Sequence, residues 1–139
     1  MDMSVVIVDD SEVDRFMIKR RLLEAQDFGD VVEIAAGDIF LEEYFSAPSA
    51  SVDAQKLLVL MDINMPRLTG FDTIAQMQER LADGKGPTDC IVLILTSSDN
   101  PDDIKMADMF DIVEGYIVKP VGRADVDLIR SVYEERLAA

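Results

Sequence analysis

Apolar segments of strand length alternate with segments of helical periodicity along the whole chain, five times each. Strict alternation of this kind is typical of a parallel sheet whose right-handed connections place helices on both faces. We therefore expect an α/β fold with a doubly wound, five-stranded parallel sheet. The strands are predicted at residues 4–8, 31–35, 57–61, 90–95 and 115–118, and the helices at residues 11–25, 38–45, 70–81, 101–110 and 123–137.

Size and charge restrict the classes of function. The 139 residues fit one domain, and a hydrophobic content of 49% is enough for a real core. The 28 acids against 13 bases leave a formal net charge of -15, which argues against direct binding of nucleic acid or of an anionic membrane surface. The apolar runs are too short to span a bilayer and no secretion signal opens the chain, so we expect a cytoplasmic protein. Histidine is absent, which excludes phosphohistidine chemistry on this chain, and the single Cys90 is expected to be a buried structural thiol.

The segment 57–70, LLVLMDINMPRLTG, carries an acid at the end of its apolar run. An unbroken run such as 57–61 is typical of a strand that is buried on both faces. Asp62 follows it directly, and ligands in open α/β sheets bind outside the carboxyl ends of the strands. Thr69 then has the position of a helix cap, as does Ser11, which stands at capping-box spacing from Asp14. Taken alone, Asp62 is equally well explained as the polar end of a core strand.

Polar residues follow four of the predicted strands. Because the carboxyl ends of parallel strands lie along one edge, these residues should converge, although each alone is also explained by a solvated turn, a loop or a cap. Several carboxylates in one crevice are good ligands for a hard cation such as magnesium. An acceptor carboxylate, a divalent cation, an ammonium and a hydroxyl are the parts needed to move a phosphoryl group onto an aspartate. The residues are Asp9 and Asp10 after the first strand, Asp62 after the third, Thr96 after the fourth and Lys119 after the fifth.

The stretches VVIVDDSE, VLMDINMPRLTGFD, LILTSSD and GYIVKP together resemble the signatures of the receiver domain of two-component response regulators. The resemblance covers nearly the whole chain. It implies a flavodoxin-like fold with strand order 2-1-3-4-5 and helices on both faces. It also implies a phosphoacceptor signalling protein that receives a phosphoryl group from a sensor histidine kinase or a histidine phosphotransfer protein and then switches its binding to a downstream protein target.

The resemblance also assigns roles to individual residues. Asp62 is the expected phosphoacceptor. Asp10, Asp62 and the backbone carbonyl of Asn64 would bind magnesium or manganese directly, and Asp9 would act mainly through water. Lys119 would pair with the phosphoryl oxygens. Thr96 and Tyr116 would form the conformational switch.

Further expectations concern a departure from the family, the extent of the chain, its docking face and one loop. Arg67 stands where the family often has glycine, so a bulky cation is expected to overhang the site. Residues 1–139 are expected to be a single, stand-alone receiver without an output domain, catalysing only its own magnesium-dependent phosphorylation and dephosphorylation. Its expected docking face comprises the fourth helix, the fifth strand and the fifth helix, and a homodimer is left open. The loop at residues 46–56 is expected to be long and mobile.

Three other readings stay open at this point. A pseudo-receiver would use the same fold as a binding module without phosphorylation, but every position that the chemistry needs is filled. A metal-dependent phosphatase with an aspartate nucleophile would need a second acid two residues after Asp62, where Asn64 stands. A flavodoxin would need a phosphate-binding Ser/Thr/Gly loop after the first strand, where Asp9 and Asp10 stand instead.

Overall fold

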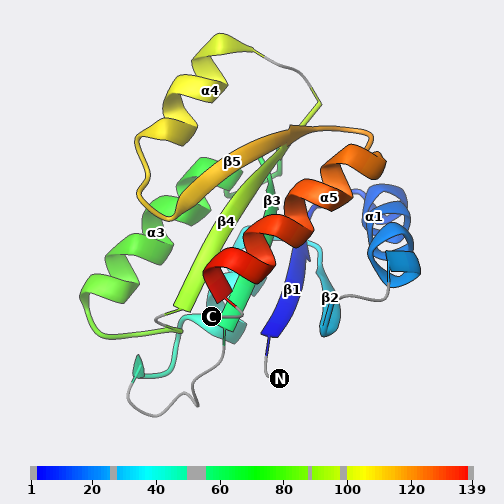
Figure 1. The fold of residues 1–139 in the computed structure, drawn as a ribbon. Coiled ribbons are helices and arrows are strands. Elements are labelled where there is room, and N and C mark those ends of the chain that lie inside the picture. The colour runs from blue at the N-terminus through cyan, green and yellow to red at the C-terminus, as the bar shows by residue number, and fades with distance from the viewer. Residues whose placement is uncertain (1–2, 26–27, 50–55, 88, 98–99, 138–139) are drawn as a thin grey trace.

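The computed structural model describes residues 3–25, 28–49, 56–87, 89–97 and 100–137, and its elements form a single five-stranded sheet. All strand pairs are parallel and the order is β2-β1-β3-β4-β5, so the predicted flavodoxin-like topology is confirmed (Figure 1). The strands are β1 (Met3–Val8), β2 (Asp30–Ile34), β3 (Lys56–Asp62), β4 (Asp89–Thr96) and β5 (Val113–Val118). The helices are α1 (Glu12–Ala25), α2 (Gly37–Tyr44), α3 (Gly70–Ala82), α4 (Pro101–Asp108) and α5 (Arg123–Val132), the last continued by the π-helical turn η2 (Tyr133–Leu137).

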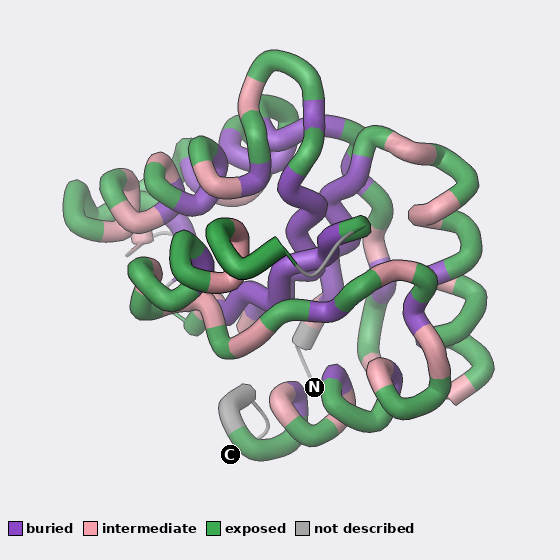
Figure 2. Tube along the Cα trace, turned by 90° about the horizontal axis from the view of Figure 1, so that it is seen from above, coloured by how far each residue is buried: buried purple, intermediate pink, exposed green. Residues whose placement is uncertain are grey.

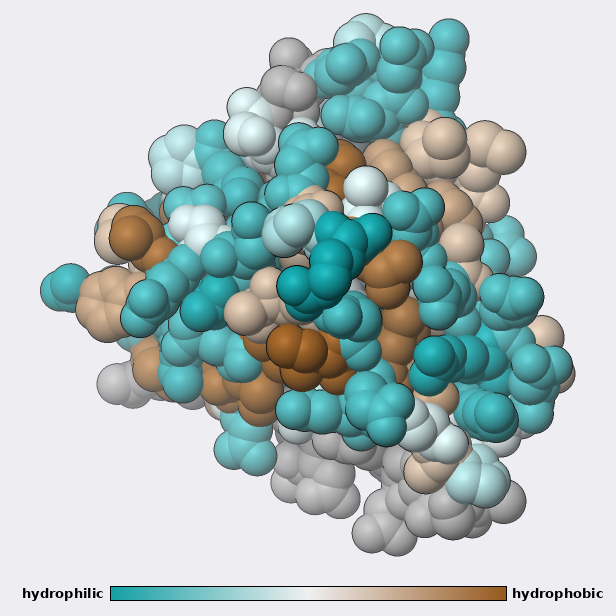
Figure 3. Space-filling view, turned by 180° about the vertical axis from the view of Figure 1, so that it is seen from behind, coloured by the Kyte–Doolittle hydropathy of each residue, from teal (hydrophilic) through white to brown (hydrophobic). Residues whose placement is uncertain are grey.

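Two hydrophobic cores lie on the two faces of the sheet. One is made with α1 and α5, through residues such as Leu22 and Ile129, and the other with α2, α3 and α4, through residues such as Phe40 and Ile74. The central strand β3 contributes to both cores and is buried from Leu57 onward, which explains its unbroken apolar sequence (Figure 2). Hydrophilic residues cover most of the rear surface, with hydrophobic ones visible between them (Figure 3).

Helix caps bear out part of the sequence reasoning. The Thr69 hydroxyl accepts a hydrogen bond from the Asp72 amide at 3.1 Å, and the Asp72 carboxylate accepts one from the Thr69 amide at 3.3 Å, which completes a capping box at the start of α3. At α1 only half of the predicted box forms. The Asp14 amide donates to the Ser11 hydroxyl at 3.2 Å, but the Asp14 carboxylate accepts a hydrogen bond from Lys119 instead.

Several element boundaries differ from prediction. Strand β5 begins two residues before the predicted start, because a bulge at Glu114 lets pairing resume from Val92↔Val113 to Leu93↔Gly115. The regular α-helix of α5 stops at Val132, and α4 stops at Asp108 rather than 110. Ser49 in the loop expected to be mobile is held against the turn after α3, where its amide donates to the Gly84 carbonyl at 2.7 Å. Residues 50–55 of that loop lie outside the described part.

Within the described ranges, no helix has the length and apolar character needed to cross a membrane. Cys90 is half-buried as a residue, and burial of its thiol raises the pKa to about 12. The thiol therefore stays protonated at neutral pH, as expected of a structural cysteine.

Candidate functional site

The pairing register brings the polar residues after the strands to one edge of the sheet. Val8, the last residue of β1, pairs with Met61 of β3, and Asp62 pairs with Leu95 of β4. Thr96 pairs with the last residue of β5, and its carbonyl accepts a hydrogen bond from the Lys119 amide at 2.8 Å. Asp9, Asp62, Thr96 and Lys119 thus follow or end four strands at the same level, as the parallel topology predicts.

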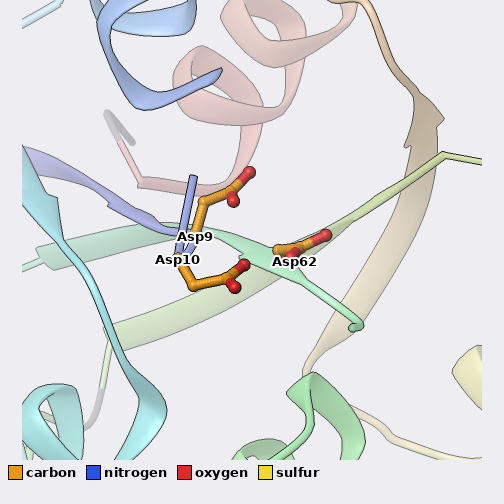
Figure 4. A group of neighbouring side chains, drawn as sticks. All are labelled: Asp9, Asp10 and Asp62. Carbon is orange, nitrogen blue, oxygen red and sulfur yellow. The ribbon is translucent and has the colours of Figure 1, made fainter. Parts of the chain in front are cut away.

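Three carboxylates gather at this edge. Oxygens of Asp9, Asp10 and Asp62 all lie within 4.8 Å of one another, and the side chains leave the ends of neighbouring strands (Figure 4). Asp9 is fully buried and Asp62 is 5% exposed, whereas Asp10 is exposed. Carboxylate oxygens at this spacing, with one side open to solvent, fit a hard divalent cation that keeps part of its water shell.

Lys119 supplies the positive charge of the site. Its ammonium lies 3.0 Å from Asp9 Oδ2, 3.0 Å from Asp14 Oδ2 and 3.3 Å from Asp62 Oδ1, and its side chain is 14% exposed. Burial alone would lower the pKa of this ammonium, but hydrogen bonds to Asp14 and Asp9 and the charge of Asp62 together raise it above the ordinary lysine value. Lys119 is therefore fully charged at neutral pH.

The carboxyl of Asp62 has the opposite balance. Burial and the neighbouring charge of Asp9 raise its pKa to about 6, against the lowering effect of Lys119. A single ammonium does not neutralise the acids around it, so the site has an excess of negative charge at neutral pH.

The chain matches the family model of the response regulator receiver domain over residues 5–130. It is 30% identical over 122 residues to the two-component response regulator ORR3 of Oryza sativa subsp. indica, a match that covers 88% of this chain and 83% of ORR3. The chain belongs to the receiver family of response regulators. Solved structures agree on the fold: a two-component response regulator from Cytophaga hutchinsonii matches with a TM-score of 0.73 at 22% identity, over 99% of this chain and 98% of that one. The chemotaxis protein CheY4 of Vibrio cholerae matches with a TM-score of 0.68 at 22% identity, over 99% of this chain and 100% of that one.

In this receiver, α1 orients the first acid. The Arg15 guanidinium donates to the backbone carbonyl of Asp9 at 2.7 Å and lies 3.4 Å from Glu33 of β2, while the Ser11 amide donates to Asp9 Oδ1 at 2.9 Å. Sequence reasoning missed Arg15 and the contact of Asp14 with Lys119. Their position in the first turn of α1 was the available signal, because α1 follows β1 and therefore starts at the same edge of the sheet.

The backbone directly after Asp62 is held by the start of α3. The Gly70 amide donates to the Ile63 carbonyl at 2.8 Å, and a Cβ at Gly70 would collide with the Asp62 carbonyl. A glycine is needed here because the backbone of the helix start approaches the strand end so closely.

Three further residues of the predicted site come from β4, β5 and the loop after β3. Thr96 is 3% exposed at the end of β4, Tyr116 is 37% exposed on β5, and Asn64 is exposed in the loop after β3. Their assigned roles in switching and metal binding stay predictions. Arg67, expected to overhang the site, instead pairs with Asp38 of α2 through two contacts of 3.1 Å. Its φ of 68° explains why glycine suits this position.

Proposed function

We propose that this receiver accepts a phosphoryl group on Asp62 from a histidine kinase or a histidine phosphotransfer protein and thereby switches its binding to a protein target. The observation that carries the proposal is the placement of Asp62. Its buried carboxylate lies 3.3 Å from the Lys119 ammonium and within the group formed with Asp9 and Asp10. A carboxylate so placed has both a fixed position and positive charge beside it.

In the proposed reaction an oxygen of ionised Asp62 attacks the phosphorus of the donor. The bond from phosphorus to the donor nitrogen breaks and its electron pair stays on that nitrogen. Lys119 faces the new phosphoryl oxygens as a point charge, and Thr96 donates its hydroxyl to one of them. Asp10, Asp62 and the Asn64 carbonyl would hold a magnesium ion directly, and Asp9 would hold it through water. Such an ion would supply positive charge to offset the negative charge on those oxygens.

The proposed output is a shift at the surface of α4, β5 and α5. Large hydrophobic side chains are exposed on all three elements or beside them, including Met109 at 75%, Tyr116 at 37% and Leu128 at 41%. A phosphoryl group adds about two negative charges and three strong acceptors beside Thr96. Movement of Thr96 toward it would free the space that Tyr116 needs to turn inward, so the state of Asp62 changes the shape of the docking face. We further propose that this receiver works in the cytoplasm.

Intact-mass measurement tests the phosphoacceptor. After incubation with magnesium and a small phosphodonor, the parent protein should gain one acid-labile phosphoryl group, and peptide mapping should place it on Asp62. Asp62→Asn should show no gain. Asp111→Asn should behave as the parent does, because Asp111 is exposed and precedes β5, at the opposite end of that strand from Lys119. A parent that gains no mass would support the pseudo-receiver instead, and an Asp62→Asn protein that still gains a phosphoryl group would remove the assignment.

The switch has a separate test. Thr96→Ala should still be phosphorylated but should lose the response of Tyr116, followed by NMR with beryllofluoride as the phosphoryl mimic. Swinging a two-state equilibrium almost completely needs on the order of 5 kcal/mol. A few charge-assisted hydrogen bonds of about 1.5–3 kcal/mol each can supply that amount. An unchanged Tyr116 response in Thr96→Ala would contradict the relay.

A further inference from the structure

We propose that Asp14 is a positioning residue: from the first turn of α1 its carboxylate binds the Lys119 ammonium, and it thereby shortens the life of a phosphoryl group on Asp62. The proposal rests on the function proposed above and adds a fourth acid to the site. Asp14 Oδ2 accepts a hydrogen bond from Lys119 Nζ at 3.0 Å, the same distance as that to Asp9 Oδ2.

The donors of Lys119 are all committed in the structure. An ammonium carries three N–H groups. Lys119 Nζ lies within 3.3 Å of one oxygen each of Asp9, Asp14 and Asp62, and the side chain is only 14% exposed. Phosphoryl transfer consumes the charge of the Asp62 carboxylate, so the phosphoryl oxygens then compete with the remaining partners, Asp9 and Asp14, for these N–H groups.

Asp14 is the partner that would be given up. The side chain of Asp9, the other remaining partner, is 0% exposed and belongs to the group of acids that fits a cation. The Asp14 side chain is 42% exposed and is not part of that group, so cation binding does not draw it away from Lys119. Asp14 and Lys119 also line a pocket of about 200 Å³ with Met17 and Val121, which gives the released carboxylate access to water.

The contact between Asp14 and Lys119 thus destabilises the state in which Asp62 is phosphorylated. In the resting protein it adds to the attraction on the ammonium, and after phosphoryl transfer it competes with the phosphoryl oxygens for the same N–H donor. Its negative charge also repels the phosphoryl group. Removing the charge of Asp14 should therefore strengthen binding at the phosphoryl position and slow loss of the phosphoryl group.

Glu12 provides the matched control for a general charge effect. It lies in the same first turn of α1, is exposed, and among the described residues has no hydrogen bond or ion pair with Lys119. Glu12→Gln removes one negative charge, as Asp14→Asn does. Asp14→Glu keeps the charge and can reach Lys119 through its longer side chain, so it should restore the behaviour of the parent.

The test is a beryllofluoride titration of the full chain at saturating magnesium, followed by NMR and repeated for the four proteins. Asp14→Asn should bind beryllofluoride about fivefold more tightly than the parent. This factor equals about 1 kcal/mol, the upper end of the range measured for exposed ion pairs. Asp14→Glu and Glu12→Gln should lie within about twofold of the parent. The magnesium affinity measured without beryllofluoride should be the same for Asp14→Asn and Glu12→Gln. A change in beryllofluoride affinity without a change in magnesium affinity is a result that a merely structural role of Asp14 would not produce.

Each result decides the proposal. Equal or weaker beryllofluoride binding by Asp14→Asn relative to Glu12→Gln overturns the role of Asp14, while the proposed function stands if the parent binds the mimic. A parent that binds no beryllofluoride overturns both. Should Asp14→Asn fail to fold, Asp14→Ala replaces it, because alanine suits a helix and the Asp14 amide keeps its bond to Ser11.

Discussion

Two acids near the same edge of the sheet experience opposite electrostatic environments. Asp62 is buried beside Asp9, and its pKa is raised to about 6. Asp38 is exposed at the start of α2, and its hydrogen bond from the Arg67 guanidinium lowers its pKa. Both acids have a cationic partner within 3.3 Å, so distance to a cation does not explain the difference.

Burial and the number of neighbouring acids explain it. Three carboxylates share Lys119 in a region with little water. Arg67, by contrast, donates two hydrogen bonds to the single carboxylate of Asp38 at an exposed position. In the Lys119 group, removing the cation and removing an acid should change stability in opposite directions. In the pair of Arg67 and Asp38, water replaces whichever partner is lost, and either removal should have a small effect.

Lys119→Met should produce the largest loss of stability. It keeps an apolar side chain of similar length but leaves the buried Asp9 and Asp62 without a cation. Removing one partner of a buried ion pair costs about 3 kcal/mol or more, so we expect a loss of that size in EDTA at a pH of about 7.5, measured by urea unfolding. Lys105→Met, which removes an exposed lysine of α4, is the control and should change stability little. Equal losses in the two variants would mean that Lys119 does not compensate the buried acids.

Magnesium should stabilise the parent by nearly as much. Binding to the folded state alone adds about 2.7 kcal/mol at a hundredfold excess of ligand over its dissociation constant. Thermal melts should therefore shift upward with magnesium in the parent and much less in Asp10→Asn, which removes one of the three grouped carboxylates. An equal shift in the two proteins would show that Asp10 does not contribute to a shared metal site.

Asp62→Asn should stabilise the metal-free protein, with a characteristic dependence on pH. Because the pKa of Asp62 is about 6 when folded against a model value of 3.8, the folded state retains a proton that the unfolded state loses between these values. The parent therefore loses stability as the pH rises through this window, and the Asp62→Asn substitution removes that loss. We expect a gain of about 2 kcal/mol above a pH of about 7, after allowance for water at the open side of the site, and almost none at a pH of about 3.5. Thermal melts in EDTA across this pH range measure the gain in stability. A gain that is independent of pH would contradict the raised pKa of Asp62.

The strand ends could be predicted from sequence because two simple features determine them. Apolar runs end at Val8, Met61 and Leu95, and parallel pairing then forces the following polar residues to the same edge. The local capping signal of Thr69 with Asp72 was also predictable, since both partners lie within one turn, whereas the box of Ser11 with Asp14 forms only in half.

Helix-borne contributions to the site could not be predicted in this way. Whether Asp14 turns back to Ser11 or reaches Lys119, 105 residues away, depends on how α1 packs against the end of β5, which periodicity does not reveal. The direction of the Arg67 side chain likewise depends on its positive φ and on the position of α2. The residues whose roles were missed are thus those placed by packing angles rather than by strand register.

The smallest effects are expected at Arg67, where the backbone and the ion pair oppose each other. Arg67→Gly and Arg67→Ala both remove the pair with Asp38, but only glycine relieves the left-handed backbone conformation of φ 68°. Arg67→Gly should therefore melt above Arg67→Ala, and both should differ from the parent by less than Lys119→Met and Asp62→Asn do. Because Asp38 and Arg67 are exposed, a salt concentration of about 0.5 M should weaken their pair in the parent and bring the parent closer to both variants. The difference between Arg67→Gly and Arg67→Ala should stay unchanged. A loss in Arg67→Ala as large as that in Lys119→Met, and unchanged in salt, would show that the exposed pair contributes as much as the buried group, and the contrast drawn between them would then fail.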